Sequence, residues 1–294
     1  MDEPHKSYNC KFILTSFLII LFSFLFNNVY AADKNTDTLQ RVSTQIKLKI
    51  RQYPNLLCGV YVKPFWIKGE ININGDSVFP AASLIKIPIA VVLLQSLDKE
   101  KVSWDQYLIL KKHEYASGAG YLKTKKAGTK IKLKEVFKLM LIISDNTATN
   151  MIIDLLGGIY ATNEQIRKLG LRNTKLINYM GDFKGLNKTS PRDLITILTK
   201  SLEGSLLKSD SKRILKKTLF KVNNKSLIKK GLGRYTRFAH KTGTIGLCVG
   251  DAGIVYFPLG KTIGISIIVK RPFNNLQGQK VIREISRLVY EYLG

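Results

Sequence analysis

The segment Phe79-Pro-Ala-Ala-Ser-Leu-Ile-Lys-Ile-Pro88 marks the point at which the chain changes from a strand pattern to a helix pattern. The run from Ile85 to Leu94 is apolar apart from Lys86, which predicts a buried helix. Ser83 lies at the start of this helix, where free backbone N–H groups and the helix dipole favour negative charge. Lys86 follows one turn later, so its side chain shares a face with Ser83, about 5–6 Å away between Cβ atoms.

Strand and helix patterns precede and follow this junction. The N-terminal side begins with an amphipathic helix, predicted by apolar residues at three- and four-residue spacing: Leu39, Val42, Ile46, Ile50 and Tyr53. A strand pattern follows at Cys58 to Phe65, and Asn74-Gly75 predicts a hairpin between Ile71–Ile73 and Val78–Phe79. Helices and loops dominate from Ser83 to about Arg213.

Strands return near the C-terminus in three apolar, β-rich runs: Phe238–Thr242, Gly250–Phe257 and Thr262–Lys270. A second amphipathic helix ends the chain and carries Val281, Ile285, Leu288, Val289 and Tyr292. This order predicts an α/β unit over about 37–80 and 214–294, split by an all-α insertion over about 81–213. One domain is thus expected over 33–294, with a ligand cleft between its two parts.

The first thirty residues have a composition of their own. Phe12 to Phe26 is uncharged and rich in Phe, Leu and Ile, Lys6 and Lys11 precede it, and Ala31 follows. This is the pattern of a signal peptide over residues 1–31. The alternative is an uncleaved anchor, because Phe12 to Ala32 is just long enough to span a bilayer. In both cases we expect an exported protein, periplasmic or secreted.

The exported part retains two cysteines and a large positive charge. Cys58 and Cys248 lie in strand patterns, which favours two buried free thiols over one disulfide. The net charge of +26 would attract anionic polymers, but no nucleic-acid-binding motif accompanies it. We therefore expect a monomer without a nucleic-acid partner, whose surface binds anionic cell-wall polymers or nothing. No metal or cofactor is expected, since no ligand cluster is apparent around His113 or His240.

Ser-x-x-Lys is a weak signal by itself. In this lysine-rich chain the pattern starts at Ser83, Ser96, Ser205, Ser209 and Ser226. Its ordinary interpretation is a helix N-cap followed by a lysine that extends to water. Ser83 differs because a buried helix follows it, and because Lys86 in the first turn opposes the helix dipole. Burial lowers the pKa of a lysine, which can then act as base for a serine nucleophile.

Two further strings complete a set. Ser144-Asp-Asn146 occurs once, between an apolar run and a helix pattern, and Lys241-Thr-Gly243 lies at the end of a strand pattern. Alone, the first is typical of helix capping and the second of a strand end. All three strings appear in order, each at a boundary between elements. Together they have the composition of an acyl-transfer site that works without histidine.

These strings resemble the class A β-lactamase family of penicillin-recognising serine hydrolases. The resemblance is carried by Phe79–Pro88, Ser117-Gly-Ala-Gly-Tyr-Leu122, Ile142-Ile-Ser-Asp-Asn-Thr-Ala-Thr-Asn150 and His240-Lys-Thr-Gly-Thr244. It implies an α/β (α+β) fold: an antiparallel five-stranded sheet flanked by the N- and C-terminal helices, with an inserted all-α subdomain. It also implies that the strands of Cys58 and Cys248 lie too far apart for a disulfide, which needs Cα atoms within about 7 Å.

The resemblance implies catalytic roles for four residues. Ser83 would be the acylated nucleophile, and Lys86 would be its base partner. Ser144 would pass a proton to the leaving nitrogen. Asn146 would contact both Lys86 and the substrate amide.

The resemblance also implies a substrate-binding strand. Lys241 would attract the substrate carboxylate, and Thr242 and Thr244 would hydrogen-bond it. Backbone N–H groups of Ser83 and Thr244 would form the oxyanion hole, with Gly243 between the two threonines.

One family feature is missing. Class A β-lactamases carry a Glu-x-x-Leu-Asn loop whose glutamate activates the deacylating water. The corresponding stretch here, Leu176 to Pro191, contains no glutamate, and Asp182 is the only carboxylate between Gln165 and Arg192. Losing a general base costs about 10²–10⁴ in rate. Asp182 is either a substitute for the glutamate or an ordinary turn residue.

Three functional hypotheses follow. The leading one is hydrolysis of β-lactam amide bonds through a Ser83 acyl-enzyme, an activity that confers antibiotic resistance. The second is a penicillin-binding or D,D-peptidase-like acyl-transfer protein that acts on D-alanyl peptides and deacylates slowly. The third, from a different class, is a non-catalytic basic module that binds the cell wall.

Overall fold

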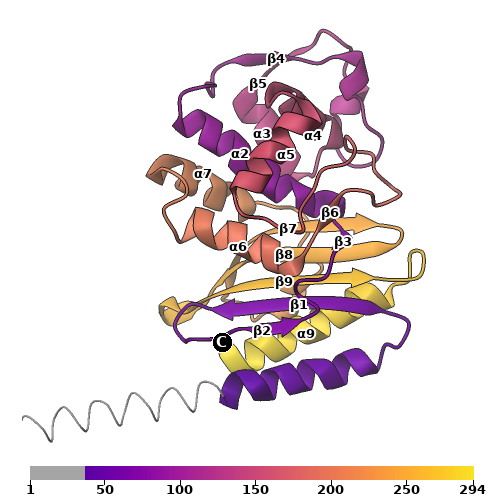
Figure 1. The fold of residues 1–294 in the computed structure, drawn as a ribbon, viewed down its shortest axis with the longest axis vertical. Coiled ribbons are helices and arrows are strands. Elements are labelled where there is room, and N and C mark those ends of the chain that lie inside the picture. Colours follow the sequence, from indigo (N-terminus) through magenta and orange to yellow (C-terminus); the bar gives the residue numbers. More distant parts are fainter. Residues whose placement is uncertain (1–36) are drawn as a thin grey trace, which may run out of the picture.

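The computed structural model describes residues 37–294 (Figure 1). The predicted signal peptide over 1–31 and its alternative, an uncleaved anchor, lie outside the described residues. None of the helices within 37–294 has the length and apolarity needed to cross a bilayer.

A five-stranded sheet forms the centre of the fold. Its order is β2-β1-β9-β8-β7, and every neighbouring pair is antiparallel. The strands are β1 (Leu57–Pro64), β2 (Ile71–Ile73), β7 (Arg237–Ile245), β8 (Cys248–Tyr256) and β9 (Thr262–Lys270). The prediction of an antiparallel five-stranded sheet is thus confirmed.

Helices lie on both sides of this sheet. Figure 1 shows the helix over 37–51 and α9 (Gln277–Leu293) together on one side, with the helical block on the other. The remaining helices are α2 (Lys86–Asp98), α3 (Leu133–Ile142), α4 (Asn146–Leu155), α5 (Gly158–Lys168), α6 (Pro191–Leu202), α7 (Ser209–Leu219) and α8 (Ile228–Gly231).

Short elements connect the helices and strands. The 3₁₀ helices are η1 (Ala82–Ile85), η2 (Lys112–Glu114), η3 (Leu122–Thr124) and η4 (Pro258–Gly260). Two small sheets pair β3 (Phe79–Pro80) with β6 (Lys188–Thr189) and β4 (Tyr107–Ile109) with β5 (Lys130–Lys132).

The sheet separates two hydrophobic cores. Val60 and Ile267 face the core formed with α9 and the N-terminal helix, whereas Tyr61 and Ile268 face the core of the helical block. Neighbouring residues of one strand enter different cores because side chains alternate across a pleated strand. Both faces of the sheet are therefore buried, which explains why its strands are apolar runs rather than alternating ones.

The predicted hairpin at Asn74-Gly75 is wrong. The turn itself forms, with Asn74 at φ +52° and the Gly75 N–H donating to Asn72 Oδ1 at 2.7 Å. After the turn, however, Phe79–Pro80 leaves the edge of the sheet and pairs with Lys188–Thr189. Local residues determined the turn, but the strand after it pairs with residues more than a hundred positions further along the chain.

The two cysteines are free, buried thiols, as the strand patterns predicted. Cys58 pairs with Val269 and Cys248 with Lys270, so β9 lies between their strands. Burial raises the pKa of each thiol to about 12. Neither thiol is therefore reactive at neutral pH.

The two-sided burial of β9 predicts how stability responds to mutation. Ile267→Ala empties space in a position with no exposed surface, so we expect the free energy of unfolding to fall by about 2–5 kcal/mol. Ile109→Ala removes the same atoms from a side chain that is 52% exposed and should cost less than about 0.5 kcal/mol. Urea unfolding followed by circular dichroism measures both; similar losses would contradict this account of the core.

Candidate active site

Ser83 lies in η1, between the end of β3 and the start of the buried helix α2. Two glycines on neighbouring strands let η1 approach the sheet closely. Gly243 of β7 is paired with Gly250 of β8, and a Cβ on Gly243 would lie 3.0 Å from the backbone nitrogens of Ser83 and Leu84. A Cβ on Gly250 would lie 3.0 Å from the Leu84 side chain. The backbone of β7 therefore passes directly beside Ser83.

Lys86 is the centre of the site, with no exposed surface. Its Nζ lies 3.3 Å from Ser83 Oγ and 3.1 Å from Ser144 Oγ, and donates to Asn146 Oδ1 at 2.7 Å and to the Ser144 carbonyl at 2.5 Å. Four oxygens thus surround a group that has three protons when charged and two when neutral. A neutral Lys86 has too few protons for all four oxygens. At least one serine hydroxyl can therefore donate its own proton to the lysine nitrogen.

The surroundings of Lys86 favour that neutral form. Burial, and then the positive charge of Lys241, lower the pKa of Lys86 well below its usual value, while Asp145 opposes the shift. Desolvation disfavours an ammonium because the interior solvates charge poorly. A lysine in this state can take a proton from an adjacent hydroxyl.

The turn between α3 and α4 brings the second serine to Lys86. Ser144 has φ +61°, a left-handed conformation that is uncommon for a residue with a side chain. Ala82, directly before the first serine, has φ +45°. Each such conformation costs on the order of 1–3 kcal/mol and persists only where the surroundings hold it. Ser144 carries one of the two hydroxyls at Lys86, and Ala82 directly precedes the residue that carries the other. Both are therefore strained.

Asp145 holds this turn in place. It is fully buried, caps α4 by accepting from the Ala148 N–H at 2.9 Å, and accepts from the Tyr121 and Leu122 N–H groups at 2.8 and 2.9 Å. The segment that precedes η3 is thereby fixed against α4. Asn146 adds a further link, since its Nδ2 donates to the Ser117 carbonyl at 2.8 Å.

Lys241 is a second buried lysine, with 1% of its surface exposed. Its Nζ donates to the Thr242 carbonyl at 2.8 Å. Burial lowers the pKa of Lys241 to about 8, and Asp251 opposes the shift. Behind the strand, Asp251 Oδ1 pairs with His240 Nδ1 at 2.8 Å, and Asp251 Oδ2 accepts from the Ile228 N–H at 3.1 Å.

The structure therefore brings Ser83, Lys86, Ser144 and Asn146 together, with Gly243 beside Ser83. Thr242 is buried and Thr244 is exposed, so their hydroxyls lie in different environments. Their predicted contact with a substrate carboxylate, and the oxyanion hole, stay predictions.

Sequence reasoning missed Asp145 as the anchor of the turn and Asp251 as the partner of His240. The sequence did contain an indication of Asp251, because it is the only charged residue in the apolar run Gly250–Phe257.

The loop from Leu176 to Pro191 is closed by its own side chains. Asn187 Oδ1 accepts from the Ile177 and Asn178 N–H groups at 2.6 and 2.9 Å. Asp182 Oδ2 accepts from the Asn187 N–H at 2.6 Å, and its Oδ1 is buried without a partner among the described residues. Phe183, after Asp182, reaches Gly118: a Cβ there would lie 3.1 Å from the ring.

The expectation that no ligand cluster surrounds His113 is wrong. His113, Glu114 and Asp154 place potential ligand atoms within 4.8 Å of one another. Sequence could not show this, because Asp154 lies about forty residues further along the chain. The oxygens are engaged by protein donors: Asp154 accepts from His113 Nε2 at 2.6 Å and Tyr179 at 2.5 Å, and Glu114 accepts from the Lys111 N–H at 2.6 Å. The cluster works as a hydrogen-bond network that joins η2 to α4.

The sequence of this chain is similar to that of known proteins. The sequence model of the Beta-lactamase enzyme family matches residues 40–293. β-Lactamase VEB-1 of Pseudomonas aeruginosa is 25% identical over 95% of this chain and 98% of its own length. β-Lactamase BRO-1 of Moraxella catarrhalis is 27% identical over 76% of each chain.

Solved structures give the same result. The structure of PBP-A has a TM-score of 0.83 at 40% identity, covering 87% of this chain and 95% of that one. A mutant of PBP-A has been solved as an acyl-enzyme complex with penicillin G. A β-lactamase from Sphaerobacter thermophilus has a TM-score of 0.75 at 25% identity, with 87% of this chain and 97% of the other covered. This chain belongs to the class A β-lactamase family of serine hydrolases.

Proposed function

We propose that the protein opens β-lactam amide bonds by acylation of Ser83, and that release of the acyl group is the slow step. The observation that carries the proposal is the position of Lys86, which is buried and in contact with both serine hydroxyls. A serine hydroxyl is a weak nucleophile until a base takes its proton. The lowered pKa of Lys86 supports assigning this role to it.

Acylation proceeds through three proton transfers, by way of Lys86 and Ser144. Neutral Lys86 accepts the Ser83 proton while Ser83 Oγ bonds to the lactam carbonyl carbon. Charge on the carbonyl oxygen is stabilised by the backbone N–H groups of Ser83 and Thr244. The carbonyl–nitrogen bond then breaks, and the proton passes from Lys86 through the Ser144 hydroxyl to the leaving nitrogen. Lys86 ends the step neutral again.

Lys241 would bind the substrate carboxylate. Among the described residues no carboxylate forms an ion pair with its buried ammonium. Asp251 raises the pKa of Lys241 from behind the strand, where it pairs with His240. An incoming carboxylate would restore some of the stabilisation that burial removes.

Deacylation is proposed to be slow because the loop from Leu176 to Pro191 supplies no glutamate. Its single carboxylate, Asp182, uses one oxygen to close the loop on Asn187. These observations favour the second candidate function, a penicillin-binding or D,D-peptidase-like protein that acts on D-alanyl peptides. The 40% identity to PBP-A, a mutant of which was solved as an acyl-enzyme complex with penicillin G, supports the formation of such an adduct.

Export also belongs to the proposal. It rests on the apolar run Phe12 to Phe26 and the residues around it, and a periplasmic or secreted protein would meet its substrate at the cell wall.

Intact mass spectrometry after addition of penicillin G tests the proposal. We expect a covalent adduct that outlasts a typical enzyme turnover by about 10²–10⁴, the factor that a general base contributes. Ser83→Ala should abolish the adduct. Ser226→Ala is a matched control, because Ser226-Leu-Ile-Lys229 repeats the sequence of Ser83-Leu-Ile-Lys86 outside the site. Multiple rapid turnovers would contradict slow release, and an adduct on Ser83→Ala would contradict the nucleophile.

The pKa of Lys241 sets a pH limit on acylation. Lys241 must be protonated to attract a carboxylate, so the second-order rate constant for acylation should fall as pH rises through about 8. Lys241→Arg keeps its charge at all these pH values and should move the fall to higher pH. Stopped-flow measurements between pH 6 and 10 compare the two proteins. If the acylation rate constant of Lys241→Arg fell at the same pH as that of the parent protein, the fall would have to come from a group other than Lys241.

Asp182→Asn decides whether Asp182 replaces the missing glutamate. The asparagine side chain can still accept from the Asn187 N–H, so the loop should close as before. We expect the lifetime of the penicillin adduct to change by less than about threefold. An increase of about 10² or more would identify Asp182 as the general base.

A further inference from the structure

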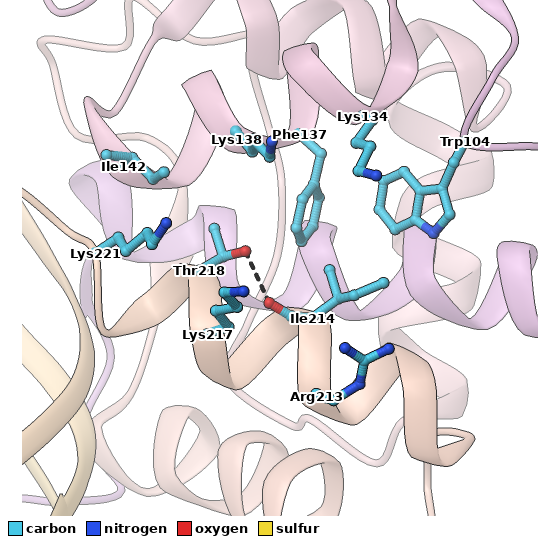
Figure 2. A pocket seen from close by; sticks show the side chains of 10 residues that line it. All are labelled: Trp104, Lys134, Phe137, Lys138, Ile142, Arg213, Ile214, Lys217, Thr218 and Lys221. Atoms are coloured by element: carbon cyan, nitrogen blue, oxygen red, sulfur yellow. Dashed lines mark hydrogen bonds between the residues drawn. The ribbon is translucent and has the colours of Figure 1, made fainter.

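A groove of about 390 Å³ lies between α3 and α7 (Figure 2). Its floor is apolar. Phe137 of α3 and Ile214 of α7 line it, and Trp104 closes one end with its ring edge-on to Phe137, 5.2 Å between centroids. Ile142, two residues before Ser144, lies at the other end in Figure 2. No part of the proposed acylation step uses this groove.

The rim of the groove carries five positive charges: Lys134, Lys138, Arg213, Lys217 and Lys221. None of the ten described residues that line the groove is acidic. Within residues 37–294 the four lysines form no ion pair, and Arg213 pairs only with Asp210, whose side chain is 84% exposed. An ion pair that exposed contributes little. The positive charge of the rim is therefore uncompensated.

Helix stability alone does not explain this arrangement. Lys134 and Lys138 are four residues apart on α3, as are Arg213 and Lys217 on α7, and like charges at this spacing repel. Lys217 lies in the last turn of α7, where the dipole favours a cation. Lys134 lies in the first turn of α3, where the dipole opposes one. A bound anion would reduce the repulsion between these like charges and the unfavourable interaction of Lys134 with the dipole of α3.

A second cavity has a lining of the opposite charge. That cavity shares Trp104 with the groove, has a volume of about 610 Å³, and its lining includes Asp98, Glu100 and Asp210. Its only cation is Lys208. The net charge of +26 is thus not spread evenly over the surface.

The lining restricts the chemistry of a ligand. The rim offers hydrogen-bond donors, and no carboxylate or amide side chain lines the groove to accept. The Thr218 hydroxyl already donates to the Ile214 carbonyl at 2.7 Å, as the dashed line in Figure 2 shows. The groove fits a ligand with an acceptor-rich anionic head and an apolar body.

We propose that this groove seats an anionic phospholipid of a bilayer surface. The phosphate lies among the rim lysines, and the first part of an acyl chain lies along the partly buried Trp104 and Ile214. Each basic side chain near an anionic bilayer strengthens binding about fivefold. The contact holds the catalytic domain at a membrane, independently of the chemistry at Ser83.

Vesicle co-sedimentation tests the charge requirement. Phosphatidylcholine vesicles with and without phosphatidylglycerol are compared at about 0.15 M salt. The double variant Lys138→Gln/Lys217→Gln removes two rim charges and should weaken binding to the anionic vesicles about tenfold or more. Lys47→Gln/Lys280→Gln removes two charges from the helices on the far side of the sheet and should change binding less than about twofold. Equal losses, or no binding to anionic vesicles, would overturn the proposal.

Trp104 fluorescence tests the apolar floor. In a Trp66→Phe protein, Trp104 is the only tryptophan. A short-chain phosphatidylglycerol should change its emission, whereas glycerol phosphate, which has the head but no chain, should not. Equal responses would indicate a site for phosphate polymers, and a response to polyglutamate that also depends on Lys138 and Lys217 would indicate an acidic peptide; either result overturns the lipid. Penicillin acylation should be unchanged in the groove variant, which separates this test from that of Ser83.

Discussion

Burial of the Lys86 amine is the constraint on which the site depends. A lysine without exposed surface cannot stay charged unless its surroundings compensate it, and here the second buried lysine, Lys241, makes the charge still less favourable. The oxygens of Ser83, Ser144 and Asn146 converge on the amine in place of water. The same arrangement that satisfies the buried amine holds it in contact with two hydroxyls.

The rest of the domain holds these groups in position. The sheet supplies the paired Gly243 and Gly250, against which η1 packs without a side chain in between. The helical block supplies Asp145, whose carboxylate orders both the start of α4 and the segment before η3. The strained backbone at Ser144 persists because contacts on both sides fix it. The site thus forms only where the sheet and the helical block meet.

Sequence patterns predicted the elements better than their partners. The apolar runs that became β8 and β9 were visible because strands buried on both faces need apolar residues throughout. The turn at Asn74 was also correct, but the strand after it pairs with Lys188–Thr189, a choice that local residues do not encode. Asp251 and the network around Asp154 were missed for the same reason. Their partners lie far away along the chain.

The tetrapeptide Ser-Leu-Ile-Lys occurs twice, at Ser83 and at Ser226. The sequence by itself determined the apolar strand runs and the three strings, because spacing and apolar periodicity are local properties. The family and its five-stranded sheet followed from the resemblance that these strings carry. Only the tertiary structure distinguishes the two lysines. Lys229 donates to the nearby carbonyls of Gly233 and Thr236. Lys86 instead lies in the interior on α2 and contacts Ser144 in the turn between α3 and α4. Burial and long-range contacts change the pKa of an amine, and a tetrapeptide specifies neither.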